Sequence, residues 1–150
     1  RIYMPRIKVS TPDNPRFRME RKVGISDLNY AKHLDSTAMV AILHEARLQM
    51  LGDLGFTEGN IYGLGLVVTD FAIEYRAESF ANDTLIIDVS VGEFTRYGCD
   101  IGFTVNNAAL DQIVCKAKVG VVFMDFDKHQ LADVPAAFKT RIEMPQVRVA

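Results

Sequence analysis

A polar segment directly ahead of a long apolar stretch carries the side chains best suited to chemistry. It holds Asp27, Asn29, His33 and Asp35, and the apolar stretch begins at Ser36. Polar groups at a helix start lie beside free backbone N–H groups and the positive end of the helix dipole. Such a junction can hold a carbonyl group or stabilise an oxyanion. The sequence therefore favours catalysis at this junction.

The apolar stretch has the spacing of a helix. Its apolar stripe repeats every three or four residues and comprises Met39, Leu43, Ala46, Met50 and Leu54. Further apolar residues widen the stripe, so we expect a mostly buried helix over residues 36–54. Asp35 or Ser36 is the expected N-cap, and Gly55 can take the left-handed conformation that ends helices.

Strand patterns flank this helix. The alternating segment FRMERKV predicts a strand over residues 17–23. Four further predicted strands cover residues 66–75, 84–94, 97–106 and 112–125. The links between them are short, which favours antiparallel neighbours. Residues 134–141 predict a terminal helical turn. One long helix ahead of a run of strands predicts an α+β fold whose sheet wraps around that helix.

The composition is typical of one soluble domain. The 150 residues are 49% hydrophobic and 24% charged, which suits a single sizeable core. Prolines predict an extended arm over residues 1–15, to which we assign no function, and residues 16–150 form the predicted domain. No segment approaches the roughly 20 continuous apolar residues that span a membrane.

Charge and cysteine content narrow the expected partners. The net charge is −2 and the basic residues are scattered, which argues against nucleic acid or an anionic membrane as a partner. Cys99 and Cys115 lack metal-ligand spacing, so we predict reduced core thiols, no metal and a cytoplasmic setting. Small molecules or proteins are the expected partners.

Five segments of the chain carry a more specific pattern. Asp27-Leu28-Asn29 and His33-Leu34-Asp35-Ser36 are similar to a turn of the form D-x-D-x-x-G-H-V-N-N, and Glu45-Ala46-Arg47 follows in the helix. The segments GLGLVVTDFAIEYRAES and VVFMDFDKHQLADVP match a strand after the helix and a closing strand. Over roughly residues 17–140 the chain resembles the hotdog-fold acyl-CoA thioesterases of the 4-hydroxybenzoyl-CoA thioesterase type. The resemblance implies an antiparallel five- or six-stranded sheet around one long central helix.

The resemblance also implies a reaction and an assembly. The reaction is hydrolysis of an acyl-CoA thioester to free acid and CoA, and coenzyme A is part of the substrate rather than a cofactor. The implied assembly is a homodimer or homotetramer with active sites at subunit interfaces. In that family the second acidic residue of D-x-D is the base or nucleophile, and a first-turn amide polarises the thioester carbonyl. These roles fall on Asn29 and on the amide of Ser36 or its neighbour.

Asn29 departs from the family pattern, because an amide can position water or a thioester but cannot accept a proton. His33, Asp35 and Glu45 are the nearby groups that could replace the missing carboxylate. We favour His33 or Glu45, since imidazole suits proton transfer near neutral pH and Asp35 has the position of a helix cap. Asp27, Asn29 and His33 also resemble the Asp, Asn and His group of plant acyl-carrier-protein thioesterases, although the register differs.

Each candidate also has a structural interpretation. Asp27 and Asn29 can satisfy backbone groups of the turn, and His33 can be a hydrogen-bonded structural histidine. Glu45 lies on the helical side shared with Gln49, where a solvated or interface glutamate is equally expected.

Substrate binding requires an apolar slot and cations for the CoA phosphates. For the slot, between helix and sheet, the candidates are Met39, Leu43, Leu64 and Leu66. Gly63 and Gly65 suggest a close approach to the neighbouring helix beside that slot. For the phosphates, the candidates are Arg76, Arg96 and Lys118.

Two other functions fit parts of the pattern. A protein that binds an acyl thioester without cleaving it is an alternative, because Asn29 replaces the expected carboxylate. A hotdog 3-hydroxyacyl-thioester dehydratase is less favoured, since Asp27 precedes His33 by one residue more than its D-x-x-x-x-H pattern requires.

Overall fold

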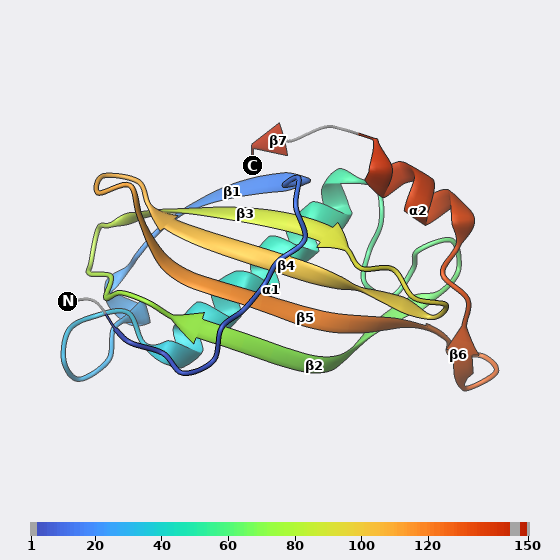
Figure 1. The fold of residues 1–150 in the computed structure, drawn as a ribbon, viewed down its shortest axis with the longest axis horizontal. Helices are drawn as coiled ribbons and strands as arrows, with labels where there is room; N and C mark the ends of the chain where they lie inside the picture. The colour runs from blue at the N-terminus through green and yellow to red at the C-terminus, as the bar shows by residue number, and fades with distance from the viewer. Residues whose placement is uncertain (1–2, 145–147, 150) are drawn as a thin grey trace.

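One long helix lies against a curved sheet in the computed structural model, which describes residues 3–144 and 148–149 (Figure 1). The elements in chain order are β1 (Phe17–Lys22), the short 3-10 helix η1 (Ile25–Asp27), α1 (Ser36–Asp53), β2 (Gly65–Tyr75), β3 (Thr84–Gly92), β4 (Gly98–Asn107), β5 (Gln112–Asp125), β6 (Gln130–Ala132), α2 (Ala136–Glu143) and β7 (Arg148–Val149). Within the described part of the chain, no helix is both long and apolar enough to cross a membrane.

The strands are ordered β2-β5-β4-β3-β1-β7 across the sheet, and the short β6 pairs with the end of β5. The pairs β1–β3, β3–β4, β4–β5, β2–β5 and β5–β6 are antiparallel, and among the described strands only the two-residue β7 pairs in parallel, with β1. These strands and α1 confirm the predicted α+β architecture, in which a mainly antiparallel sheet wraps around one helix.

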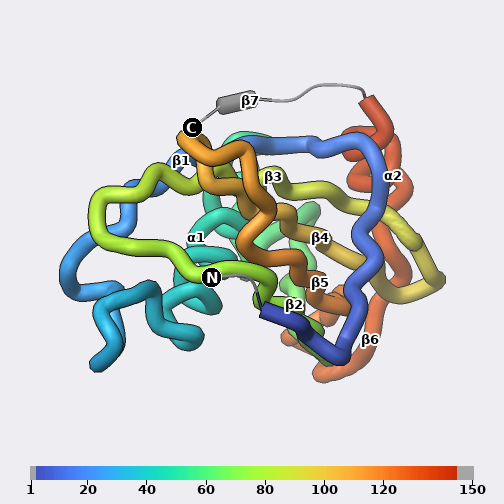
Figure 2. Tube along the Cα trace, turned by 60° about the vertical axis from the view of Figure 1, so that its left-hand side comes forward, coloured from blue at the N-terminus to red at the C-terminus, as the bar shows by residue number. Residues whose placement is uncertain are grey.

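The prediction that short links join neighbouring strands is correct for β3–β4 and β4–β5 but wrong for β2–β3. β2 pairs with β5, whereas β3 lies between β4 and β1. The link of residues 76–83 therefore leaves one edge of the sheet and returns further across it, past the start of α1 (Figure 2). Backbone contacts with the polar segment hold the link there. Leu34 N donates a hydrogen bond to Ser79 O at 2.7 Å, and His33 forms an isolated antiparallel β-bridge with Phe80.

The core lies between α1 and the inner face of the sheet. Alternate strand residues point inward, so Ile101, Phe103 and Val105 of β4 are buried. Burying each such side chain contributes on the order of 2 kcal/mol. The cysteines are buried free thiols, as predicted, and desolvation is the main cause that raises the pKa of Cys99 and of Cys115 to about 12.

The ends of α1 follow the signals in the sequence. Asp35 is the N-cap, and its carboxylate accepts a hydrogen bond from Thr37 N at 3.0 Å. Gly55 has a φ of +89°, the left-handed conformation expected after the last turn. The helix ends at Asp53, one residue earlier than predicted.

Residues 3–16 form neither helix nor strand. Figure 1 shows this segment crossing the face of the sheet opposite α1 before it enters β1. The N-terminal arm, as we call residues 3–16, therefore lies on the sheet rather than extending from it.

Candidate functional site

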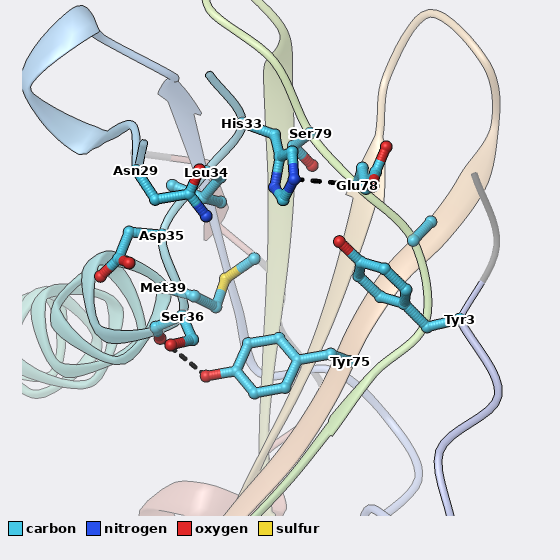
Figure 3. Close-up of a pocket in the computed structure, with 11 residues that line it drawn as sticks. Tyr3, Asn29, His33, Leu34, Asp35, Ser36, Met39, Tyr75, Glu78 and Ser79 are labelled. Carbon is cyan, nitrogen blue, oxygen red and sulfur yellow. Dashed lines mark hydrogen bonds and ion pairs between the residues drawn. The ribbon is translucent and has the colours of Figure 1, made fainter. Parts of the chain in front are cut away.

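A pocket of about 280 Å³ lies at the start of α1 (Figure 3). Its lining comes from the N-terminal arm, the polar segment, the first turn of α1, the end of β2 and the link 76–83. The lining residues are Tyr3, Asn29, His33, Leu34, Asp35, Ser36, Met39, Tyr75, Ala77, Glu78 and Ser79. Five of the predicted site residues therefore share one pocket, namely Asn29, His33, Asp35, Ser36 and Met39.

Backbone hydrogen bonds within the polar segment hold His33 at the pocket. Asn29 N donates to His33 O at 2.9 Å, and Lys32 N donates to Asn29 O at 3.0 Å. Asp35 N then donates to Asp27 O at 2.9 Å, which places the N-cap directly after this turn. The polar segment is thus held by its own backbone hydrogen bonds before α1 begins.

His33 pairs with a carboxylate across the pocket. Its Nε2 lies 3.6 Å from Glu78 Oε1, and the two side chains are 19% and 8% exposed. The rings of His33 and Phe80 also lie in a T-shaped arrangement, with their centroids 6.3 Å apart. A largely buried carboxylate at this position can orient an imidazole and stabilise the positive charge that develops when the ring takes up a proton.

Asp35 has the contacts of a helix cap rather than of a free base. Its carboxylate accepts hydrogen bonds from the hydroxyl and the backbone N–H of Thr37. These bonds, that of the hydroxyl first, lower the pKa of Asp35 from its ordinary value. A carboxylate that is kept ionised and occupied in this way is poorly suited to accept a proton from water.

Tyr75 fixes the first turn of α1 to the end of β2. Its hydroxyl donates to Ser36 O at 2.7 Å, as Figure 3 shows. Burial raises the pKa of Tyr75 to about 12, so the hydroxyl keeps its proton at neutral pH. The helix start, where backbone N–H groups can face a carbonyl, is thereby held beside the strand.

Asn29 combines a structural contact with a place in the pocket. Its side-chain oxygen accepts a hydrogen bond from Ala31 N at 2.9 Å, which makes an Asx turn. The NH₂ group is then the part of the amide that can donate to a ligand. Asn29 can position a water molecule or a thioester oxygen, but it cannot act as the base.

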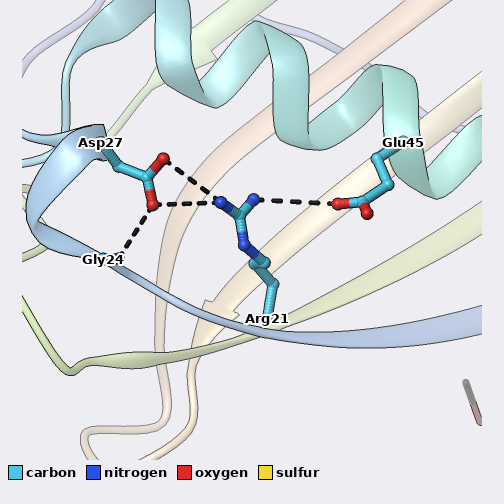
Figure 4. A network of polar contacts seen from close by, with 4 residues as sticks. All are labelled: Arg21, Gly24, Asp27 and Glu45. Atoms are coloured by element: carbon cyan, nitrogen blue, oxygen red, sulfur yellow. Dashed lines mark hydrogen bonds and ion pairs between the residues drawn. The ribbon is translucent and has the colours of Figure 1, made fainter.

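The structure does not bring Asp27 and Glu45 to this pocket. Arg21 lies between them, as Figure 4 shows, with one guanidinium nitrogen 3.1 Å from Asp27 Oδ2 and another 3.8 Å from Glu45 Oε2. Asp27 also accepts a hydrogen bond from Gly24 N at 2.9 Å. Both carboxylates therefore serve contacts that join β1, η1 and α1.

Three more predicted substrate-binding residues also lie elsewhere. Leu43 lines a separate hollow of about 190 Å³ between α1 and β2, and Leu66 is buried in the core. Gly63 adopts a left-handed turn conformation with a φ of +86°. None of these three residues lines the pocket at the start of α1.

The predicted approach of Gly65 to the helix is wrong. A side chain at Gly65 would collide with the ring of Phe126 rather than with α1. Gly65 begins β2, and Figure 1 shows that end of the strand far from the start of the helix. The close neighbour of Gly65 is therefore Phe126, in the segment directly after β5.

The predicted phosphate-binding cations are all paired with carboxylates. Arg76 pairs with the buried Glu74, Arg96 Nε lies 2.9 Å from Asp133, and Lys118 Nζ lies 3.7 Å from Asp100. Arg96 is in the turn between β3 and β4, which Figure 1 shows at the opposite end of the sheet from the start of α1. Their role toward CoA stays a prediction.

Among the pocket residues that were not predicted from the sequence are Glu78, Ser79, Tyr75 and Tyr3. Residues 78 and 79 lie in a segment whose sequence predicts only a turn, and no local sequence pattern links them to His33. Tyr75 had a usable signal, because its place at the end of an alternating strand puts its ring on the inner face. Tyr3 had none, since its position depends on the course of the whole arm.

Comparison with known proteins identifies the family. The model of the thioesterase-like superfamily matches residues 23–142. The chain therefore belongs to the thioesterase-like superfamily, and it is a thioester hydrolase with a hotdog fold. No curated protein matches the sequence significantly.

Solved structures of other proteins share this fold at low sequence identity. Slr0204, a 1,4-dihydroxy-2-naphthoyl-CoA thioesterase from Synechocystis, has a TM-score of 0.78 and 19% identity, covering 87% of this chain and 98% of its own. SAV2348 from Staphylococcus aureus, solved in complex with CoA, has a TM-score of 0.77 and 12% identity, covering 89% and 85%. The 12:0-ACP thioesterase from Umbellularia californica has a TM-score of 0.74 and 17% identity, covering 84% and 52%.

Proposed function

We propose that this protein hydrolyses an acyl-CoA thioester to a free acid and CoA in the pocket at the start of α1. The observation that carries the proposal is the His33–Glu78 pair beside the N-terminus of a capped helix, in one cavity. Two structural relatives support CoA as the thiol, since Slr0204 is a naphthoyl-CoA thioesterase and SAV2348 was solved with CoA.

In the proposed mechanism His33 is the general base. Nε2 faces Glu78, so Nδ1 is the nitrogen that accepts a proton from the attacking water. The water oxygen bonds to the thioester carbon, and the oxyanion forms near the backbone N–H groups at the start of α1. Collapse of this intermediate breaks the C–S bond, and the thiolate of CoA takes the proton from His33.

Of the two bases that the sequence analysis favours, the contacts support His33. His33 lines the pocket, whereas Glu45 is 49% exposed at its side chain and pairs with Arg21. Asn29, with its side-chain oxygen held by Ala31 N, presents an NH₂ group that can orient the water or the thioester.

The proposal includes a second copy of the chain along β2. β2 is the outermost strand of the sheet, and no strand within the described residues pairs with its outer edge. Val67, Val68 and Phe71 on this strand are 36%, 40% and 40% exposed. A long edge strand with exposed apolar side chains favours pairing with another strand, and β2 ends at Tyr75 in the pocket.

Thiol release from a panel of short, medium, long and aromatic acyl-CoAs tests the proposal. We expect turnover with at least one of them. Tight binding without turnover across the panel would instead support a protein that binds acyl thioesters without cleaving them.

His33→Ala and Glu45→Ala separate the two bases in the same assay. We expect His33→Ala to lower kcat by roughly a hundredfold or more, because general base catalysis contributes at least that much. Glu45→Ala is the matched control, and we expect a rate within a few-fold of the wild type. The opposite order of the two rates would assign the base to Glu45.

A further inference from the structure

We propose that the N-terminal arm is part of the active site and that Tyr3 limits the length of the acyl group that the pocket accepts. This inference rests on the proposed function, because it assigns the acyl part of the substrate to one end of the pocket. The observations behind it are the anchoring of the arm and the position of Tyr3 between two hollows.

The arm is anchored beside the pocket by backbone and side-chain contacts. Tyr3 N donates to Arg76 O at 2.6 Å, directly after β2. Further along, Val9 N donates to Glu74 Oε1 at 2.8 Å, and the same carboxylate pairs with Arg76. The side chain of Glu74 is fully buried, so departure of the arm would remove a donor from a buried carboxylate.

Two glycines make room for the arm on the sheet. A β-carbon at Gly102 would lie 2.8 Å from both Thr11 and Pro12, and one at Gly92 would lie 2.9 Å from Pro12. A side chain at either position would therefore require the arm to shift. Contacts at Tyr3, Val9 and Pro12 therefore set the path of the arm, and the backbone of Tyr3 is held where that path reaches the pocket.

Tyr3 stands between two hollows. It lines the pocket at the start of α1, and with Tyr75 it also lines a more open hollow of about 420 Å³. The other residues of that second hollow are Met4, Pro5, Arg6, Ile7 and Ile73. Because this lining is mostly apolar, the space behind Tyr3 suits a hydrocarbon chain better than the phosphates of CoA.

The two tyrosines come from different parts of the chain. Tyr75 is bonded to Ser36 O, so it belongs to the frame of the pocket. Tyr3 comes from the arm, and Figure 3 shows its ring on the side of the pocket near Glu78. With Tyr3 in place the acyl chain ends at its ring, and without that ring the chain can continue into the apolar hollow.

Substitution of Tyr3 tests the inference with butanoyl-CoA and dodecanoyl-CoA as substrates. We expect Tyr3→Ala to raise the ratio of kcat/KM for dodecanoyl-CoA to that for butanoyl-CoA by about tenfold or more. The reason is that a few methylenes of the dodecanoyl chain can then enter the apolar hollow. Tyr3→Phe keeps the ring and should keep the wild-type ratio. Tyr30→Ala is the control, since Tyr30 lies in the polar segment, is 99% exposed and does not line the pocket.

Calorimetric binding of S-butyl-CoA and S-dodecyl-CoA, which cannot be hydrolysed, separates this inference from the proposed function. A gain in dodecyl affinity in Tyr3→Ala supports the inference even in a protein that releases no thiol. Wild-type ratios of both activity and affinity in Tyr3→Ala would overturn the inference and leave acyl-CoA hydrolysis standing. Failure of the wild type to bind either analogue or to release thiol would overturn both.

Discussion

The His33 and Tyr75 side chains of the pocket are held by groups from other parts of the chain. His33 faces Glu78, and the Tyr75 hydroxyl is bonded to Ser36 O. Such contacts lower the cost of ordering the site when substrate arrives. Tyr75 matters most for the helix start, because its bond decides where the first-turn N–H groups face.

Tyr75→Phe removes this bond and keeps the ring. We expect the free energy of unfolding to fall by about 1 kcal/mol, the usual net value of one hydrogen bond. We also expect kcat to fall several-fold while KM changes little, because the shifted N–H groups act on the oxyanion rather than on the bound substrate. Urea unfolding and thiol release measure the two effects. A wild-type kcat in the variant would show that Tyr75 does not position the helix start.

At the scale of elements, the buried carboxylate of Glu74 connects β2 to the N-terminal arm. The hydrogen bond from Arg76 is the largest cause that lowers the pKa of Glu74 below its ordinary value of 4.5, and the bond from Val9 N comes second. A carboxylate with a lowered pKa adds stability above its ordinary pKa and loses that contribution as pH falls through the lowered value.

We therefore expect the free energy of unfolding to decrease as the pH falls below about 4.5, and Glu74→Gln to flatten part of that decrease. At neutral pH the same variant should lose about 1–3 kcal/mol, because a buried charged contact with Arg76 is broken. Denaturant unfolding at a series of pH values measures both. Glu143→Gln is the control, since Glu143 is exposed near the end of α2. Equal pH profiles for the two variants would contradict the role of Glu74.

For the whole molecule, the exposed edge of β2 is the surface that the proposed assembly uses. This edge adjoins the hollow between α1 and β2, which is lined by apolar residues together with His44 and Arg47. A partner strand along β2 would cover that hollow and extend the sheet into a second subunit. The pocket at the start of α1 lies at the end of the same strand, so assembly and activity should be linked.

Val68→Lys tests this link. Val68 is 40% exposed, so a lysine there can reach water in a monomer but would be buried in a dimer that pairs along β2. We expect sedimentation velocity to show a dimer for the wild type and a monomer for Val68→Lys, with the loss of most thiol release. Leu110→Lys is the control, because Leu110 is 67% exposed in the turn between β4 and β5. A dimeric, active Val68→Lys would place the interface elsewhere.

The sequence by itself determined the elements of this protein. The helix at Ser36–Asp53, its Asp35 cap, its left-handed Gly55 and the five long strands all lie within two residues of the predicted limits. Periodicity, caps and turn residues act between neighbours in the chain, so one sequence shows them directly. The polar segment before the helix was located for the same reason.

Only the tertiary structure decided which side chains meet at the site. The link 76–83 brings Glu78 to His33, and the arm brings Tyr3 to the end of β2. Asp27 and Glu45 instead form ion pairs with Arg21 of β1, outside the pocket. These contacts join residues far apart in the chain, and they depend on how strands are ordered in the sheet, which no local pattern encodes.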